Sequence, residues 1–62
     1  MKERKAIIEG RTCTVQTHDR HGASIATVVL QGRKGDVILA SDENEARAIR
    51  TARRRIKLEA IA

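Results

Sequence analysis

The sequence predicts a small α+β domain, in which an antiparallel sheet of three to four strands is followed by one C-terminal amphipathic helix. Short β-branched or alternating stretches occupy residues 5–40 and are separated by turns that contain glycine. Helical periodicity begins after Ser41, and no Gly or Pro follows that residue. Because the chain has only 62 residues, we expect residues 1–62 to form a single domain.

The first two strands are predicted on either side of Gly10. Residues 5–9 are short and β-branched, which favours a strand. Gly10-Arg11 is interpreted either as a two-residue turn or as a bulge within one longer strand. Residues 12–18 alternate, with Cys13 and Val15 on one side, and this is typical of a half-buried strand.

The next two strands follow two further turns. Residues 19–22 end in Gly and are predicted as a turn. Residues 23–31 have an apolar centre, so we expect them in the middle of the sheet. The turn at 32–35 has Gly at both ends, and residues 36–40 form the following strand. Short turns between neighbouring strands favour an antiparallel meander.

A helix is predicted from residue 42 to at least residue 55. Ser41 or Asp42 can cap its start, and Asp42 with Glu45 has the spacing of a capping box. Residues 56–60 also alternate, but the absence of Gly and Pro favours continued helix over a short closing strand. We expect Ile49 and Ile56 to face the sheet. The predicted apolar face consists of Ala46, Ile49, Ala52, Ile56 and Ala60.

Charge points to nucleic acid as the partner. The chain has 13 Lys and Arg against 8 Asp and Glu, a formal charge of +5. Six of the eleven residues at 47–57 are basic. At about 100° per residue, four of them fall within about 80° of one another and form a stripe beside the apolar face. We predict that this helix stripe binds phosphates, and its residues are Arg47, Arg50, Arg54 and Lys57.

Simpler roles for these basic residues stay open. A run of charge on a helix is often only a solvated face, and cations near a helix C-terminus favour the helix dipole by themselves. The turn with Arg33 and Lys34 is a second predicted contact to a phosphate backbone. Its alternative is an ordinary hairpin turn with soluble side chains.

Several function classes are disfavoured by composition. The chain has no Phe, Tyr or Trp, so it lacks the usual platform on which single-stranded bases stack. Cys13 is expected to be a small buried hydrophobe, because its spacing from His18 and His21 matches no recognised zinc site. We expect no enzyme activity, no metal and no cofactor. A lone cysteine and a charged amino terminus favour a cytoplasmic protein without a membrane segment.

The stretch from Thr12 to about Arg55, most visibly Ser41-Asp-Glu-Asn-Glu-Ala-Arg-Ala48 after a three-stranded meander, resembles a known group of domains. These are the amino-terminal arm-binding domains of tyrosine-type phage integrases and their AP2-like relatives. The resemblance implies that the sheet enters the major groove of DNA. The chain departs from the group in lacking the aromatic residues common in its strands.

We therefore expect a non-enzymatic, basic accessory or regulatory domain that binds nucleic acid, in particular double-stranded DNA. The alternative is a module for protein interaction or homodimerisation, in which a strand edge or the Ala/Ile face of the helix pairs with another chain.

Overall fold

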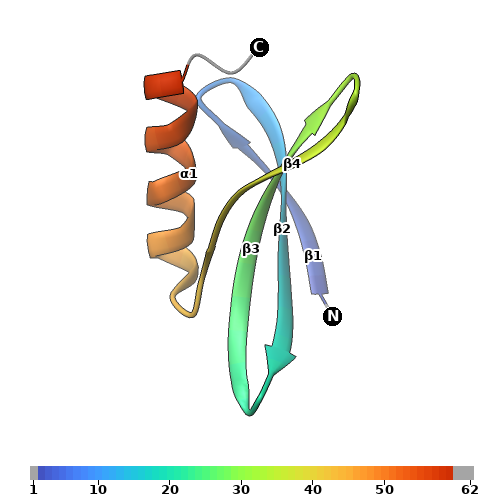
Figure 1. Cartoon of the computed structure of the whole chain (residues 1–62), viewed down its shortest axis with the longest axis vertical. Helices are drawn as coiled ribbons and strands as arrows, with labels where there is room; N and C mark the ends of the chain where they lie inside the picture. Colours follow the sequence, from blue (N-terminus) through green and yellow to red (C-terminus); the bar gives the residue numbers. More distant parts are fainter. Residues whose placement is uncertain (1, 60–62) are drawn as a thin grey trace.

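The computed structural model describes residues 2–59, which form one sheet and one helix (Figure 1). The elements are β1 (Lys2–Ile8), β2 (Arg11–Arg20), β3 (Ala23–Gly32), β4 (Gly35–Asp42) and α1 (Glu45–Glu59). Each strand pairs antiparallel with the next, in the order β1-β2-β3-β4. The predicted α+β class, the meander and the inner position of β3 are confirmed.

The first two hairpin turns have two residues each, so the first is shifted from its predicted position and the second is shorter than predicted. Glu9 and Gly10 connect β1 to β2 with φ values of 50° and 75°, so the prediction of a turn at Gly10-Arg11 is wrong by one residue. His21 and Gly22 connect β2 to β3 with φ values of 52° and 80°. Positive φ at both central residues identifies type I′ turns, whose twist matches that of the flanking strands. The strands therefore extend to the turn, and residues 19–20 are paired rather than looped.

The third turn places Arg33 and Lys34 between two glycines, as predicted. Gly32 and Gly35 are the last cross-strand pair of the β3–β4 hairpin. A Cβ atom on Gly32 would lie 2.8 Å from the carbonyl oxygen of Gly35. A side chain at position 32 would therefore force the two strands apart.

A β-bulge changes the alternation of β4. Val29 pairs with Ile38 and Val28 pairs with Ala40, which leaves Leu39 as the extra residue. Leu39 is buried, and Ala40 also packs against the core. Two successive side chains thus face the helix, and the bulge turns Ser41 to the opposite side of the sheet.

The core lies between one face of the sheet and α1, which runs along that face (Figure 1). From α1, the buried side chains are Ala48, Ala52 and Ile56. Ile49 is only partly buried and Ala46 is exposed, so the predicted apolar face is rotated from the real one. Ala60 lies outside the described residues. The sheet contributes Ile8, Cys13, Val15, Ala26, Val28, Leu30 and Leu39.

The helix begins at Glu45, three residues later than predicted, because Asp42 still pairs with Ala26 in the sheet. Its N-cap is Asn44, whose Oδ1 accepts a 3.1 Å hydrogen bond from the Arg47 amide. The Asp42 carboxylate accepts a 2.9 Å hydrogen bond from the Asn44 amide and so shapes the approach to the cap.

The predicted capping box is therefore wrong. Ser41 Oγ shares a 2.7 Å hydrogen bond with Thr27 Oγ1, and Glu45 forms a 3.1 Å ion pair with Arg4 of β1. Neither side chain caps the helix. The prediction of continued helix is confirmed for residues 56–59.

Candidate nucleic-acid interface

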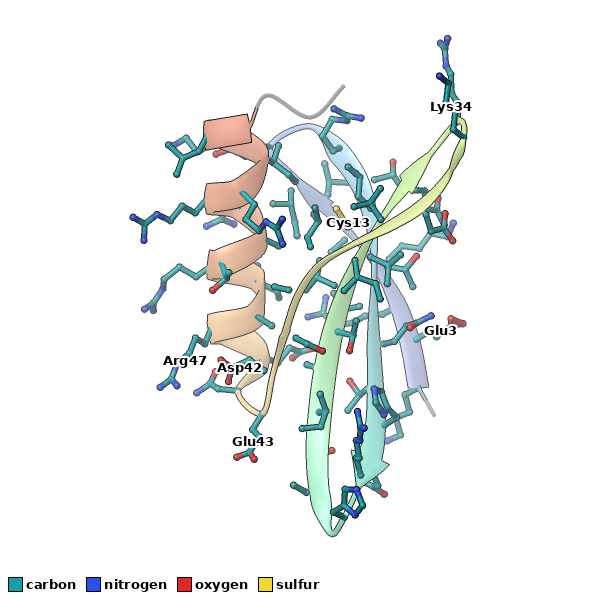
Figure 2. All side chains as sticks on the ribbon, viewed as in Figure 1. Glu3, Cys13, Lys34, Asp42, Glu43 and Arg47 are labelled. Carbon is teal, nitrogen blue, oxygen red and sulfur yellow. The ribbon has the colours of Figure 1, made fainter. Side chains whose placement is uncertain are left out.

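The outer side of α1 carries exposed arginines. Arg47, Arg50 and Arg54 lie about 140–160° around the helix axis from the centre of the buried residues. All three are exposed, and Figure 2 shows Arg47 pointing away from the sheet. The helix stripe was predicted beside the apolar face, whereas in the structure it lies opposite that face. The reason is that the real apolar face is centred on Ala52, whereas the predicted face is centred on Ile49.

Arg53 belongs to the same surface, although the predicted stripe did not include it. The side chains of Arg50, Arg53, Arg54, Lys57 and Leu58 line one open hollow of about 370 Å³. Arg53 lies about 60° around the axis from Arg50, which a long flexible guanidinium side chain easily spans. A sector around the helix axis wider than the roughly 80° of the predicted stripe would have included Arg53.

Two other helix cations, although exposed, contact groups of the chain itself. Lys57 Nζ lies 3.5 Å from Glu9 Oε1 at the β1–β2 turn. Arg55 donates a 2.9 Å hydrogen bond from Nη1 to the Leu39 carbonyl oxygen. Lys57 is therefore the weakest member of the predicted stripe, because a carboxylate already neutralises part of its charge.

The remaining helix cations form what we call the outer arginine surface, defined as Arg47, Arg50, Arg53 and Arg54. None of their guanidinium groups is in an ion pair with a carboxylate of residues 2–58, the residues whose side chains are described. Four exposed guanidinium groups on one helix side, without direct ion pairs, present a positive field to an external anion.

The second predicted contact lies elsewhere on the molecule. Arg33 and Lys34 are exposed at the end of the β3–β4 hairpin, which projects on the opposite side from α1 (Figure 2). Arg11, at the start of β2, lines the same hollow of about 650 Å³ together with Gly32 and Val37. We call Arg11, Arg33 and Lys34 the turn cluster. Sequence reasoning missed Arg11. Arg11 alternates with Cys13 and Val15, so it lies on the same face of the sheet as those two residues.

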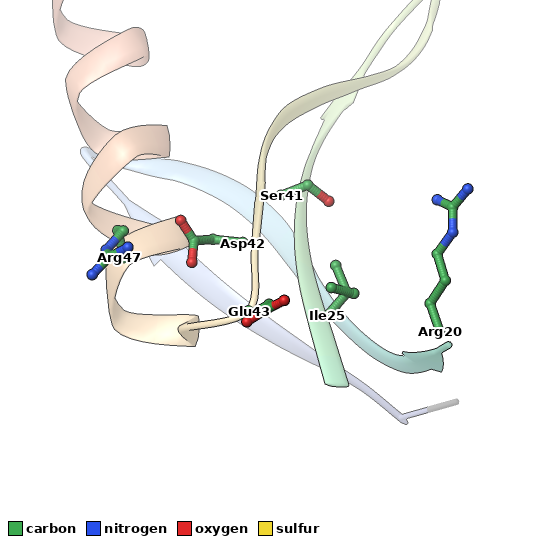
Figure 3. Close-up of a pocket in the computed structure, with 6 residues that line it drawn as sticks. All are labelled: Arg20, Ile25, Ser41, Asp42, Glu43 and Arg47. Carbon is green, nitrogen blue, oxygen red and sulfur yellow. The ribbon is translucent and has the colours of Figure 1, made fainter. Parts of the chain in front are cut away.

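A third hollow, of about 500 Å³, lies between the ends of β2 and β4 and the start of α1 (Figure 3). Arg20 and Arg47 line it, but so do Asp42 and Glu43. Because carboxylates and guanidinium groups are mixed here, the hollow does not present the uniform positive charge that a phosphate backbone selects.

Cys13 lies in the core, as predicted, and is fully buried. Burial raises the pKa of its thiol, and the nearby Arg11 charge offsets part of that rise. Its Sγ donates a weak 3.8 Å hydrogen bond to the Arg11 carbonyl oxygen. A buried thiol with a raised pKa is a poor nucleophile.

Within residues 2–59, no three His, Cys, Asp or Glu side chains gather closely enough to hold a metal ion. Over the same residues, α1 is too short and too polar to cross a membrane. Comparison of the chain with family models, curated proteins and solved structures found no match.

Proposed function

We propose that this chain is a non-enzymatic accessory or regulatory domain that binds nucleic acid, in particular double-stranded DNA, in the cytoplasm. The observation that carries the proposal is the outer arginine surface. Its four guanidinium groups are exposed on one side of α1 and have no ion pairs with described carboxylates. Phosphates that bind them release condensed counterions, which favours association.

The dimensions of this surface suit a phosphate backbone. Arg47 and Arg54 are seven residues apart, which corresponds to about 10 Å along a helix axis. That length covers about three base-pair steps at roughly 3.4 Å each. Arginine also presents a planar fork that matches a phosphate with two hydrogen bonds. The absence of aromatic side chains favours duplex over single-stranded nucleic acid, since no base can stack on an aromatic ring.

The resemblance to integrase arm-binding domains offers a different mode for the same function, in which the sheet enters the major groove. The face of the sheet turned away from α1 carries hydroxyl and amide side chains, and Gln31 donates a 3.3 Å hydrogen bond to Thr14 there. Glu3 and Lys5 share this face, so its charge is mixed. We therefore assign the primary contact to the outer arginine surface.

The second candidate function is self-association through this same open sheet face. Ile7 on β1 and Ile38 on β4 both point to it and are 69% and 63% exposed. Large exposed apolar side chains on one face are a feature of protein interfaces. The Ala/Ile face of α1 is the weaker candidate for this role, because Ala52 and Ile56 are already buried against the chain's own sheet.

An electrophoretic shift with duplex DNA, single-stranded DNA and RNA of equal length tests the proposal. We expect the duplex to be retarded at the lowest protein concentration and the shift to weaken as salt is raised. Light scattering of the pure protein, measured with and without DNA, tests the second candidate. A tight dimer that retards none of the three nucleic acids would overturn the first proposal and support the second.

A further inference from the structure

We propose that one molecule of this protein holds two segments of duplex nucleic acid at once, one on the outer arginine surface and one on the turn cluster. This inference rests on the function proposed above. It arises because the structure shows that the two groups of cations predicted from the sequence face in different directions.

The two surfaces face in different directions. In Figure 2, Arg47 points outward from α1, whereas Lys34 points away from the tip of the β3–β4 hairpin on the other side of the molecule. The domain measures 35 × 20 × 15 Å along its principal axes. A straight duplex that lies along α1 therefore leaves the hairpin tip exposed to solvent.

The turn cluster has the composition of an anion site. Among the described residues, its hollow is lined by the two hairpin cations and by Arg11, and by no carboxylate; the lining residues are Arg11, Gln31, Gly32, Arg33, Lys34, Gly35 and Val37. The nearest acidic residue in the hairpin sequence, Asp36, does not line the hollow. The Gly32–Gly35 pair holds the turn that carries two of the cations.

Two further helix cations have partners within the chain. Lys57, which borders the outer arginine surface, is in contact with Glu9, and Arg55 donates to the carbonyl of Leu39. Because Arg47 and Lys34 point in different directions, we treat the outer arginine surface and the turn cluster as two anion-binding surfaces rather than as one continuous track.

A bead-capture assay tests this inference. A biotinylated duplex is immobilised, the protein is added at saturation, and the beads are washed. A second, fluorescent duplex is then added and the captured fluorescence is measured. We expect the parent protein to capture the second duplex. The double variant Arg33→Gln/Lys34→Gln should still bind the immobilised duplex, but its capture should fall to that of beads without protein.

The control is Lys5→Gln/Arg20→Gln, which removes the same two charges from exposed positions outside both surfaces. It should capture as the parent does, and circular dichroism should show that both variants are folded. The inference is overturned if the Arg33→Gln/Lys34→Gln variant captures as much as the parent, as it would if a dimer formed the bridge. It is also overturned if the parent binds the first duplex but captures no second one, and in that case the proposed function stands. A parent that fails to bind even the first duplex would overturn both.

Discussion

Arg55 Nη1 donates a 2.9 Å hydrogen bond to the carbonyl oxygen of Leu39, the extra residue of the β4 bulge. A bulged residue loses its regular place in the ladder, so its main-chain groups need other partners. The guanidinium of Arg55 supplies one from the helix. One of the six basic residues at 47–57 thus holds α1 against the outer strand of the sheet.

We expect Arg55→Ala to lower the free energy of unfolding by about 1–2 kcal/mol, because it removes a charged donor from a partly buried carbonyl. The matched control is Arg53→Ala, which removes a guanidinium that has no such contact. Urea denaturation followed by circular dichroism measures both. Equal stability of the two variants would show that the bond to Leu39 contributes nothing.

The fit of α1 on the sheet depends on small side chains. Ala52 is fully buried, whereas Ala46 on the same helix is exposed. We expect Ala52→Leu to destabilise the domain by about 1–3 kcal/mol, because the added atoms overpack the core. Ala46→Leu, with the same change in helix propensity and volume, should leave the midpoint of thermal unfolding nearly unchanged. The reverse order would mean that Ala46, rather than Ala52, faces the sheet.

Much of this fold is predictable from local patterns. The alternation around Cys13 and Val15 indicated the helix-facing side of β2, and the apolar centre of β3 indicated an inner strand. These predictions succeeded because burial on one or both faces determines the order of apolar and polar residues along a strand. The turn at residues 32–35 was located correctly because glycine marks both of its ends.

The wrong predictions concern residues whose secondary structure depends on pairing with residues far away in the sequence. Asp42 looks like a helix cap in sequence, but its pairing with Ala26 keeps it in β4 and passes the cap to Asn44. The bulge at Leu39 depends on register with β3, which no local pattern shows. The separation of the two cation groups also follows from topology. The sequence identifies Arg33 and Arg50 as basic residues, but it does not show that their surfaces face in different directions.

His21 occupies a left-handed conformation, with φ of 52°, at the first central position of a type I′ turn. Asn adopts this conformation more readily than other non-glycine residues, and Asn-Gly is the preferred I′ pair. We expect His21→Asn to stabilise the domain by about 0.5–1 kcal/mol. His21→Val, which is β-branched and disfavours positive φ, should destabilise it. Thermal unfolding at neutral pH measures both, and a lower midpoint for the Asn variant would contradict the turn assignment.

Cys13 predicts a specific dependence of stability on pH. Burial raises the pKa of the thiol in the folded state above its value in the unfolded chain. The stabilising contribution is therefore fully present below about 8.5, the pKa of a free thiol, and is lost as pH rises through the folded-state pKa. Cys13→Ala should unfold more easily at neutral pH because it leaves a small cavity, while its deficit relative to the parent should shrink above about pH 9. A deficit that stays constant with pH would contradict this account.

The most direct test of the central claim is the salt dependence of duplex binding by the outer arginine surface. Each phosphate contact contributes about 0.9 to the slope of log affinity against log salt concentration. The double variant Arg50→Gln/Arg54→Gln keeps helix propensity nearly unchanged and should weaken binding without unfolding the domain. We expect its slope to be flatter than that of the parent by about two units. The control Lys5→Gln/Arg20→Gln loses the same charge and should change the slope much less. If the Arg50→Gln/Arg54→Gln variant binds as tightly as the parent with the same slope, these arginines are only a solvated helix face and the account is contradicted.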